Sequence, residues 1–218
     1  MKTYLSKDIR NLAMVGHSHC GKTTLIEALL TTASAIPAMG SVADGTAVTA
    51  YDEEEITRRI TITNAVAFCD WSGVKVNLID TPGFNMFIHE ARAAMLPVEA
   101  AVVVVDAVEG IQPMTPRVWN YAEEFNLPRI FVVNRVDRDH AAPAIVLEAL
   151  RSTFGRQVTP VSLPIGTGGA FRGVIDLVSM QAFEYRPDSK GRGQAIPIPE
   201  DMAEQAKSAH EELVELVA

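Results

Sequence analysis

Gly16-His17-Ser18-His19-Cys20-Gly21-Lys22-Thr23 fits the pattern G-x-x-x-x-G-K-[ST]. The apolar run at residues 11–15 precedes this loop and has the composition of a buried strand. Residues 22–30 follow it and have the spacing of a helix with one apolar face. A loop between a strand and a helix directs backbone N–H groups and the positive end of the helix dipole at an anion. The sequence therefore predicts a phosphate-binding loop.

The positions of this loop have separate predicted roles. Gly16 and Gly21 allow the backbone to turn and to approach an anion without a Cβ clash. Lys22 is expected to contact the β and γ phosphates of a nucleotide and to act in catalysis, and Thr23 is expected to bind Mg²⁺ through its hydroxyl. The other predicted nucleotide contacts of this segment are His17, Ser18, His19, Cys20 and Thr24.

A second motif, Asp80-Thr81-Pro82-Gly83, follows a run at residues 74–79 that alternates and then becomes apolar, as a strand does. Ligands of open parallel sheets bind at the carboxyl ends of the strands, which is where Asp80 is expected. A carboxylate there can hold Mg²⁺ through a water, and the N–H of Gly83 can meet a γ phosphate. We therefore predict Asp80 as a metal ligand and Gly83 as a catalytic residue.

A third motif, Asn134-Arg135-Val136-Asp137, closes the apolar run at residues 129–133. Asp137 can accept two hydrogen bonds from the N1 and N2 donors of guanine, whereas adenine has no such pair of donors. Asn134 is expected to brace the loop and contact the base, and the stem of Arg135 can cover the purine face. The motif favours GTP and GDP as ligands over ATP, although an ATP-dependent enzyme would share the first motif.

Between these motifs the chain resembles the nucleotide-binding domain of translational GTPases, and most closely elongation factor G and its paralogues. The most specific stretch is residues 101–138, AVVVVDAVEGIQPMTPRVWNYAEEFNLPRIFVVNRVDR. Asp44-Gly45-Thr46 and the run Arg58-Arg59-Ile60-Thr61-Ile62-Thr63 are similar to the first switch of that family. The resemblance implies that Thr61 binds Mg²⁺, senses the γ phosphate and takes part in catalysis. Residues 163–166 and 171–177 are similar to the start of the insert of factor G.

Four positions depart from the family pattern. Phe84 stands where the family has a histidine that orients the attacking water, and an apolar ring cannot do this by a hydrogen bond. Arg59 stands where the first switch commonly has glycine, and His19 where the phosphate loop usually has aspartate. Arg135 replaces a lysine and can still stack through its stem. The departures are typical of a divergent paralogue of factor G.

The order of elements predicts an α/β fold, with a doubly wound, mostly parallel sheet of the P-loop NTPase type and a small α+β insert at the C-terminal end. We expect a GTP-binding domain core at residues 1–156 and the beginning of the factor G insert at residues 157–218, where proline and glycine become frequent. Residues 36–57 show no persistent periodicity and are interpreted as the first switch. Since the family continues beyond this insert, we expect an amino-terminal fragment of a longer protein.

Composition restricts the partners. The 218 residues are 48% hydrophobic and carry a formal charge of −8, which opposes broad affinity for nucleic acid. No run of apolar residues approaches the length of a membrane span, and residues 1–9 are polar and mixed in charge. We expect a cytoplasmic, monomeric fragment that binds guanine nucleotide, without a membrane partner and without direct sequence-specific binding of nucleic acid.

Two hypotheses on function remain. In the first, the chain is the GTPase domain of a factor G-like protein that couples GTP binding and hydrolysis to action on the ribosome. In the second, it is a GTP-binding regulatory or interaction protein with little or no hydrolysis, because Phe84 replaces the histidine. The rate of GTP turnover, with and without ribosomes, distinguishes them.

Overall fold

The structure is a computed structural model that describes residues 3–186, 189 and 191–218. The chain divides into two compact units, one made of residues 1–105 and 112–134 and the other of residues 106–111 and 135–218. Within the described residues, no helix is both long enough and apolar enough to cross a membrane.

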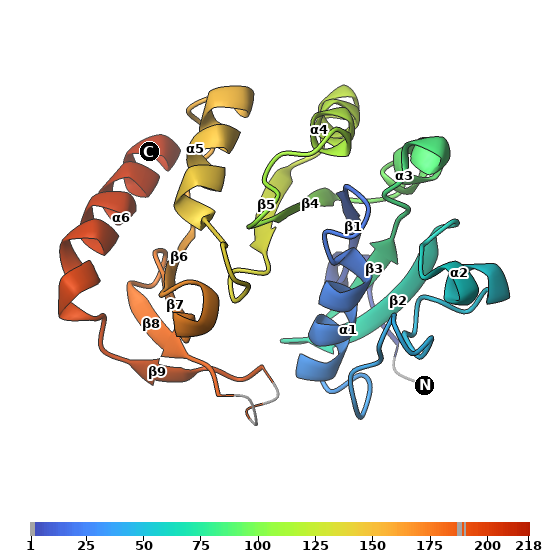
Figure 1. The fold of residues 1–218 in the computed structure, drawn as a ribbon, viewed down its shortest axis with the longest axis horizontal. Coiled ribbons are helices and arrows are strands. Elements are labelled where there is room, and N and C mark those ends of the chain that lie inside the picture. Colours follow the sequence, from blue (N-terminus) through green and yellow to red (C-terminus); the bar gives the residue numbers. More distant parts are fainter. Residues whose placement is uncertain (1–2, 187–188, 190) are drawn as a thin grey trace. The chain divides into compact units, whose positions relative to one another are not determined.

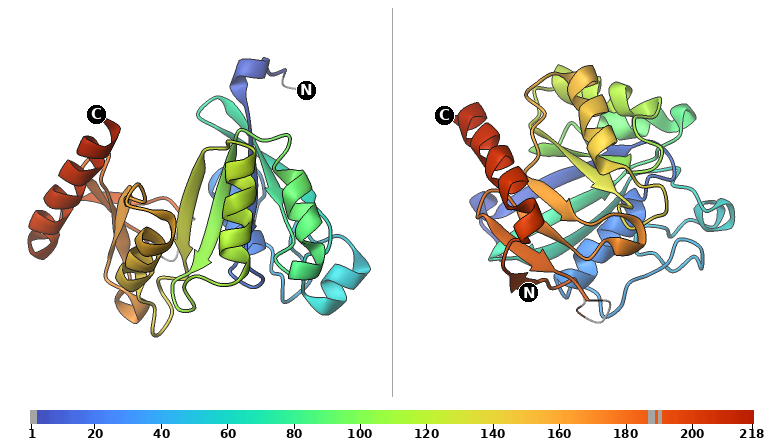
Figure 2. Two further views of the ribbon diagram at one scale, coloured as in Figure 1. Left: turned by 90° about the horizontal axis from the view of Figure 1, so that it is seen from above. Right: turned by 60° about the vertical axis from the view of Figure 1, so that its left-hand side comes forward.

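A five-stranded sheet of order β2-β3-β1-β4-β5 forms the centre of the first unit. β1 pairs in parallel with β3 and with β4, while β2 pairs with β3 in the antiparallel sense. Figure 1 shows α1 on one side of this sheet and α3 and α4 on the other, and the views of Figure 2 agree. The strands are β1 (Ile9–Gly16), β2 (Ala65–Trp71), β3 (Val74–Asp80), β4 (Ala100–Asp106) and β5 (Arg129–Asn134). The helices are α1 (Lys22–Thr32), α2 (Glu53–Arg58), α3 (Ile88–Ala94) and α4 (Met114–Glu124), with 3₁₀ turns at Ser6–Asp8 and Asn85–Phe87.

The second unit contains an antiparallel sheet of order β6-β7-β8-β9. Its strands are β6 (Ser162–Ile165), β7 (Gly173–Asp176), β8 (Gln181–Glu184) and β9 (Gln194–Ile196). Its helices are α5 (Pro143–Phe154) and α6 (Ala203–Val217), with 3₁₀ turns at Gly168–Ala170 and Glu200–Met202. The two sheets confirm the predicted α/β fold with a mostly parallel sheet and a small insert.

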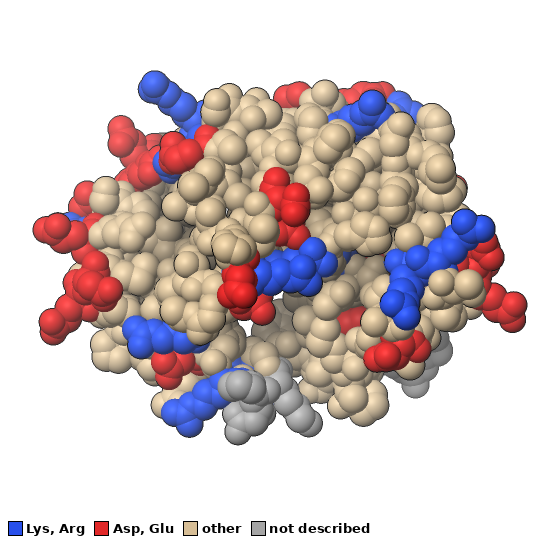
Figure 3. Space-filling model, in the orientation of Figure 1, with Lys and Arg blue, Asp and Glu red and all other residues tan. Residues whose placement is uncertain are grey.

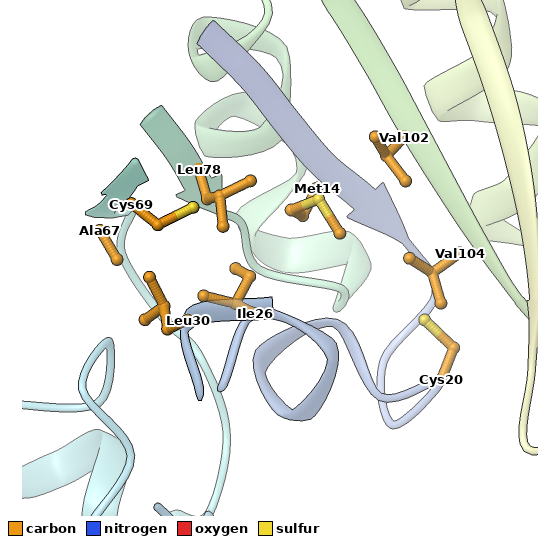
Figure 4. Close-up of a cluster of buried hydrophobic side chains, with 9 residues drawn as sticks. All are labelled: Met14, Cys20, Ile26, Leu30, Ala67, Cys69, Leu78, Val102 and Val104. Atoms are coloured by element: carbon orange, nitrogen blue, oxygen red, sulfur yellow. The ribbon is translucent and has the colours of Figure 1, made fainter. Parts of the chain in front are cut away.

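The core beside the phosphate loop joins α1 to one face of the sheet. Ile26 and Leu30 of α1 are almost completely buried against Met14, Leu78 and other side chains of the strands (Figure 4). Because the same face of α1 is anchored over three strands, the position of its first turn, and of the loop before it, is fixed by apolar packing.

One part of the predicted organisation is wrong. Residues 36–57 were expected to lack regular structure, but Glu53–Arg58 form α2. Asp52 caps this helix, since its carboxylate accepts a hydrogen bond of 2.8 Å from the N–H of Glu54. The three glutamates of the first turn complement the positive end of the helix dipole. The acidic run is therefore a helix start, which periodicity over so few residues does not reveal.

Candidate functional site

The phosphate loop connects the end of β1 to the start of α1. Gly16 lies beside β4, where a Cβ would come within 2.4 Å of the carbonyl oxygen of Val104. Gly21 has φ of 95° and precedes α1, whose first turn receives no capping bond from a side chain. The N–H groups of that turn therefore face outward from the helix start without a side-chain partner. This is the geometry with which a helix start binds an anion.

Lys22 lies across the loop that precedes it. Its ammonium donates hydrogen bonds to the carbonyl oxygens of His17, at 2.9 Å, and Gly16, at 3.2 Å, and the residue is only 6% exposed. Burial lowers the pKa of His17, and the nearby charges of Lys22 and His19 lower it further. The loop thus holds a buried cation and a histidine whose neutral form is favoured.

The three predicted metal ligands lie together. The hydroxyl of Thr23 donates to Oδ2 of Asp80 at 2.6 Å, and the hydroxyl oxygens of Thr23 and Thr61 are 3.4 Å apart. The other oxygen of Asp80, Oδ1, is buried and has no hydrogen-bond partner among the described residues. A carboxylate with one oxygen unpaired, next to two hydroxyls, fits a hydrated Mg²⁺, because the water or ion satisfies the unpaired oxygen.

Asp80 is 1% exposed, and its environment favours the neutral acid. Burial raises the pKa of Asp80, while the hydroxyl of Thr23, the charge of Lys22 and the hydroxyl of Thr49 act in the opposite direction without cancelling it. A positive ion beside the carboxylate would favour its charged form. The site is therefore electrostatically unfavourable for the apo carboxylate and is suited to a cation.

The sequence did not single out Thr49, whose hydroxyl donates to the same Oδ2 of Asp80 at 2.8 Å. Two buried glutamates were also missed. Glu27 of α1 accepts hydrogen bonds from the N–H groups of Gly40 and Val48, and Glu55 of α2 accepts from Ile62 and Thr63. No sequence motif marks Glu27 or Glu55. Their hydrogen-bond partners are distant in sequence or lie in an irregular loop.

Gly83 lies against the phosphate loop. A Cβ at position 83 would be 2.4 Å from the backbone nitrogen of Ser18 and 2.5 Å from Nζ of Lys22. The next residue, Phe84, makes an edge-to-face contact with His19, with ring centroids 5.5 Å apart. Two of the four positions that depart from the family pattern, His19 and Phe84, are thus in contact with each other.

The third motif is divided between the two units. The side-chain amide of Asn134, at the end of β5, donates to the carbonyl oxygen of Cys20 at 2.9 Å and so braces the phosphate loop. The side chain of Cys20 is buried, beside Val104 in the core (Figure 4). Thr24 follows in the first turn of α1.

Arg135 and Asp137 belong to the second unit. Arg135 has φ of 63°, and its guanidinium binds Oδ2 of Asp106 at 2.6 Å. Burial raises the pKa of Asp106, but hydrogen bonds from the Val108 N–H and from Arg135 outweigh it, so that the pKa is lowered. Asp137 is exposed, and the carbonyl of the intervening Val136 accepts a hydrogen bond from Gly168 at 2.8 Å.

A mostly parallel sheet with a Gly-x-x-x-x-Gly-Lys-Thr loop at the end of β1, facing an aspartate at the end of β3, defines a nucleotide-binding domain of the P-loop class. Residues 7–217 match the family model of the elongation factor Tu GTP binding domain. The chain belongs to this family of translational GTPase domains.

A solved structure supports the same assignment. The crystal structure of a protein from Thermus thermophilus is similar to this chain, with 37% sequence identity and a TM-score of 0.88 over 95% of the chain. The chain spans 31% of the length of that protein.

Proposed function

We propose that this chain binds GTP and GDP with Mg²⁺ and is the GTPase domain of an elongation factor G-like protein that acts on the ribosome in the cytoplasm. The observation that carries the proposal is the cluster of Thr23, Thr61 and Asp80 beside the buried ammonium of Lys22. The membership in the family of the elongation factor Tu GTP binding domain supports guanine as the base. The resemblance of residues 157–218 to the insert of factor G supports the narrower assignment.

In this proposal, different residues bind the phosphates, the base and the metal ion. The loop N–H groups at residues 16–24 and the ammonium of Lys22 bind the phosphates, and Asn134, Arg135 and Asp137 bind the base. Thr23, Thr61 and, through water, Asp80 would hold Mg²⁺, which would supply positive charge beside the β and γ phosphates. The N–H of Gly83 meets the γ phosphate. Loss of this phosphate then releases the first switch at Thr61 and the segment that begins with Asp80-Thr81-Pro82-Gly83, which is the second switch of this proposal.

The test is calorimetric titration with GDP and a non-hydrolysable GTP analogue in the presence of Mg²⁺, with ATP as the control for the base. Selective binding of the guanine nucleotides is expected. Lys22→Ala should abolish it, because the variant loses the buried ammonium that is predicted to bind the β and γ phosphates. Equal binding of ATP, or unchanged affinity in Lys22→Ala, would contradict the proposal.

A second candidate is a GTP-binding protein with little or no hydrolysis. Phe84 favours it, since the ring lies against His19 and offers no hydrogen bond to a water. GTP turnover should then be slow in the wild type and should rise in Phe84→His, where an imidazole is restored. A wild type that turns GTP over rapidly on ribosomes would exclude this candidate.

A further inference from the structure

A cavity of about 600 Å³ opens beside the phosphate loop in the first unit. His19 and Thr24 form its border on the side of the loop and α1, and residues 39–43 form another border. Arg58 and Arg59, at the end of α2, complete it. No Asp or Glu is among the described residues that line the cavity, so that its charged groups are two guanidinium groups. The chemistry of the cavity therefore favours an anion.

The two arginines of this cavity differ in their partners. Arg58 pairs with Glu54, one turn earlier in α2. Among the described residues, no carboxylate lies within ion-pair distance of Arg59. Basic and acidic side chains lie side by side in the region of α2 (Figure 3). The exposed guanidinium of Arg59 is thus available to a ligand, whereas that of Arg58 already has a counter-charge.

The backbone holds Arg59 in a conformation that suits glycine. Arg59 has φ of 56° and ψ of 40°, which is the left-handed region, and it ends α2. Its N–H and that of Ile60 bond to carbonyl groups of the last turn of the helix. A glycine would adopt this conformation without the steric penalty that any Cβ brings. The local structure therefore gives no reason for a long side chain at this position.

Arg59 also lies close in sequence to the metal-binding threonine. The hydroxyl oxygen of Thr61 is 3.4 Å from that of Thr23, at the start of α1. Two residues span at most about 7 Å of extended chain. Hydrogen bonds from Ile62 and Thr63 to Glu55 fix the segment that follows. The side chain of Arg59 thus starts within reach of the phosphates that the loop is proposed to bind.

We propose that Arg59 binds the phosphates of the nucleotide, as an arginine supplied by the first switch of the same chain. The inference rests on the proposed function and assigns a residue that it does not include. A guanidinium can form two parallel charge-assisted hydrogen bonds with a phosphate, which a glycine at this position cannot replace. Arg59 then contributes to affinity and links the end of α2 to the presence of the nucleotide.

The test compares three forms of the chain: wild type, Arg59→Gly and Ser34→Gly. Ser34 is the matched control, because it is exposed, has φ of 60° after the end of α1, and does not line the cavity. Both substitutions relieve a left-handed backbone, but only one removes a charge. Affinities for GDP and for a non-hydrolysable GTP analogue are measured by calorimetry with Mg²⁺ at low and high KCl.

Arg59→Gly is expected to weaken binding of both nucleotides by about tenfold or more, as for the loss of hydrogen bonds to a charged group. The affinity of Arg59→Gly should also depend less on the KCl concentration than that of the wild type, because the variant lacks a charge whose attraction to the phosphates salt would screen. Ser34→Gly should match the wild type in both respects.

Wild-type affinity in Arg59→Gly would overturn the inference and leave the proposed function intact. A weaker affinity with an unchanged dependence on KCl would also overturn it, because a structural defect would then be the cause. Failure of the wild type to bind either nucleotide would overturn the proposed function itself.

Discussion

The segment that we interpret as the first switch and the second sheet are held in different ways. The segment at residues 36–64 is attached by buried carboxylates: Glu27 accepts from Gly40 at 2.7 Å and from Val48 at 2.6 Å, and Glu55 accepts from Ile62 at 2.7 Å. The second sheet is held by an apolar cluster that includes Ile175 and Leu177, both fully buried. Buried carboxylates that accept from backbone N–H groups thus distinguish the first switch, whereas the sheet combines the hydrogen bonds between its strands with an apolar cluster on one face.

The two kinds of contact suit two different needs, a segment that can open and a sheet that keeps its shape. A few directional hydrogen bonds can be released one at a time, at about 1 kcal/mol each, so that a segment held by them can open without unfolding the domain. Apolar packing loses its contribution only when the whole cluster opens. The first switch is thus built to rearrange beside the proposed nucleotide site, and the second sheet to keep its shape.

The largest effect is expected in the second sheet. Leu177→Ala removes a fully buried side chain and leaves a cavity between β7, β8 and α6, which should lower the free energy of unfolding by about 3 kcal/mol. The adjacent Val178 is 69% exposed, and Val178→Ala should change the free energy of unfolding by less than about 0.5 kcal/mol. Urea unfolding followed by circular dichroism measures both. Equal effects of the two substitutions would remove the contrast between the regions.

A smaller and more local effect is expected at Glu27. Glu27→Ala leaves the N–H groups of Gly40 and Val48 without their acceptor, so that amide hydrogen exchange at these two positions should accelerate by about tenfold or more. Glu27→Gln keeps one acceptor oxygen and should have an intermediate effect. Hydrogen exchange followed by NMR distinguishes them. Protection that survives in Glu27→Ala would show that other contacts hold the first switch.

The smallest change in stability is expected at Asp80, in the proposed metal site, and it should depend on pH. Since burial raises the pKa of Asp80 in the folded state, its charged form opposes folding as the pH rises above the unfolded value of about 4. In EDTA, Asp80→Asn should therefore melt at a higher temperature than the wild type near neutral pH, and at the same temperature below about pH 4.

The same substitution should weaken Mg²⁺-dependent nucleotide binding by about tenfold or more, because an amide cannot balance the charge of the ion. Thermal unfolding at several pH values measures the effect on stability, and calorimetry with Mg²⁺ measures the effect on nucleotide binding. An Asp80→Asn variant that is less stable than the wild type at neutral pH would show that the hydroxyls of Thr23 and Thr49 outweigh the cost of burial.

Much of the fold could be predicted from local sequence. Helix spacing at residues 22–30, apolar runs such as residues 101–105, and alternation in residues 173–177 each involve a few neighbouring side chains, and the structure has a helix or a strand at each. The first two motifs also identified residues that lie together in the first unit, such as Lys22, Thr23 and Asp80, because a strand end fixes where the next residues lie.

The remaining features depend on contacts between distant residues. The bond between Thr49 and Asp80 joins positions 31 residues apart, and the two bonds of Glu27 reach 13 and 21 residues along the chain. A glutamate in the middle of a helix usually faces water, so that its type alone gave no reason to place Glu27 in the interior. The position of Asp106 opposite Arg135 likewise follows from the tertiary structure and not from either motif.

The hairpin of β2 and β3 links the two switches. Its tip is Ser72-Gly73, two residues with positive φ, and its register sets Ala65, just after the first switch, opposite Asp80, at the start of the second. Residues added at the tip would leave this alignment intact, whereas deletion of one residue within β2 would invert its buried and exposed sides and misalign the switches. The tip is therefore the place where a reporter peptide can be inserted without uncoupling them.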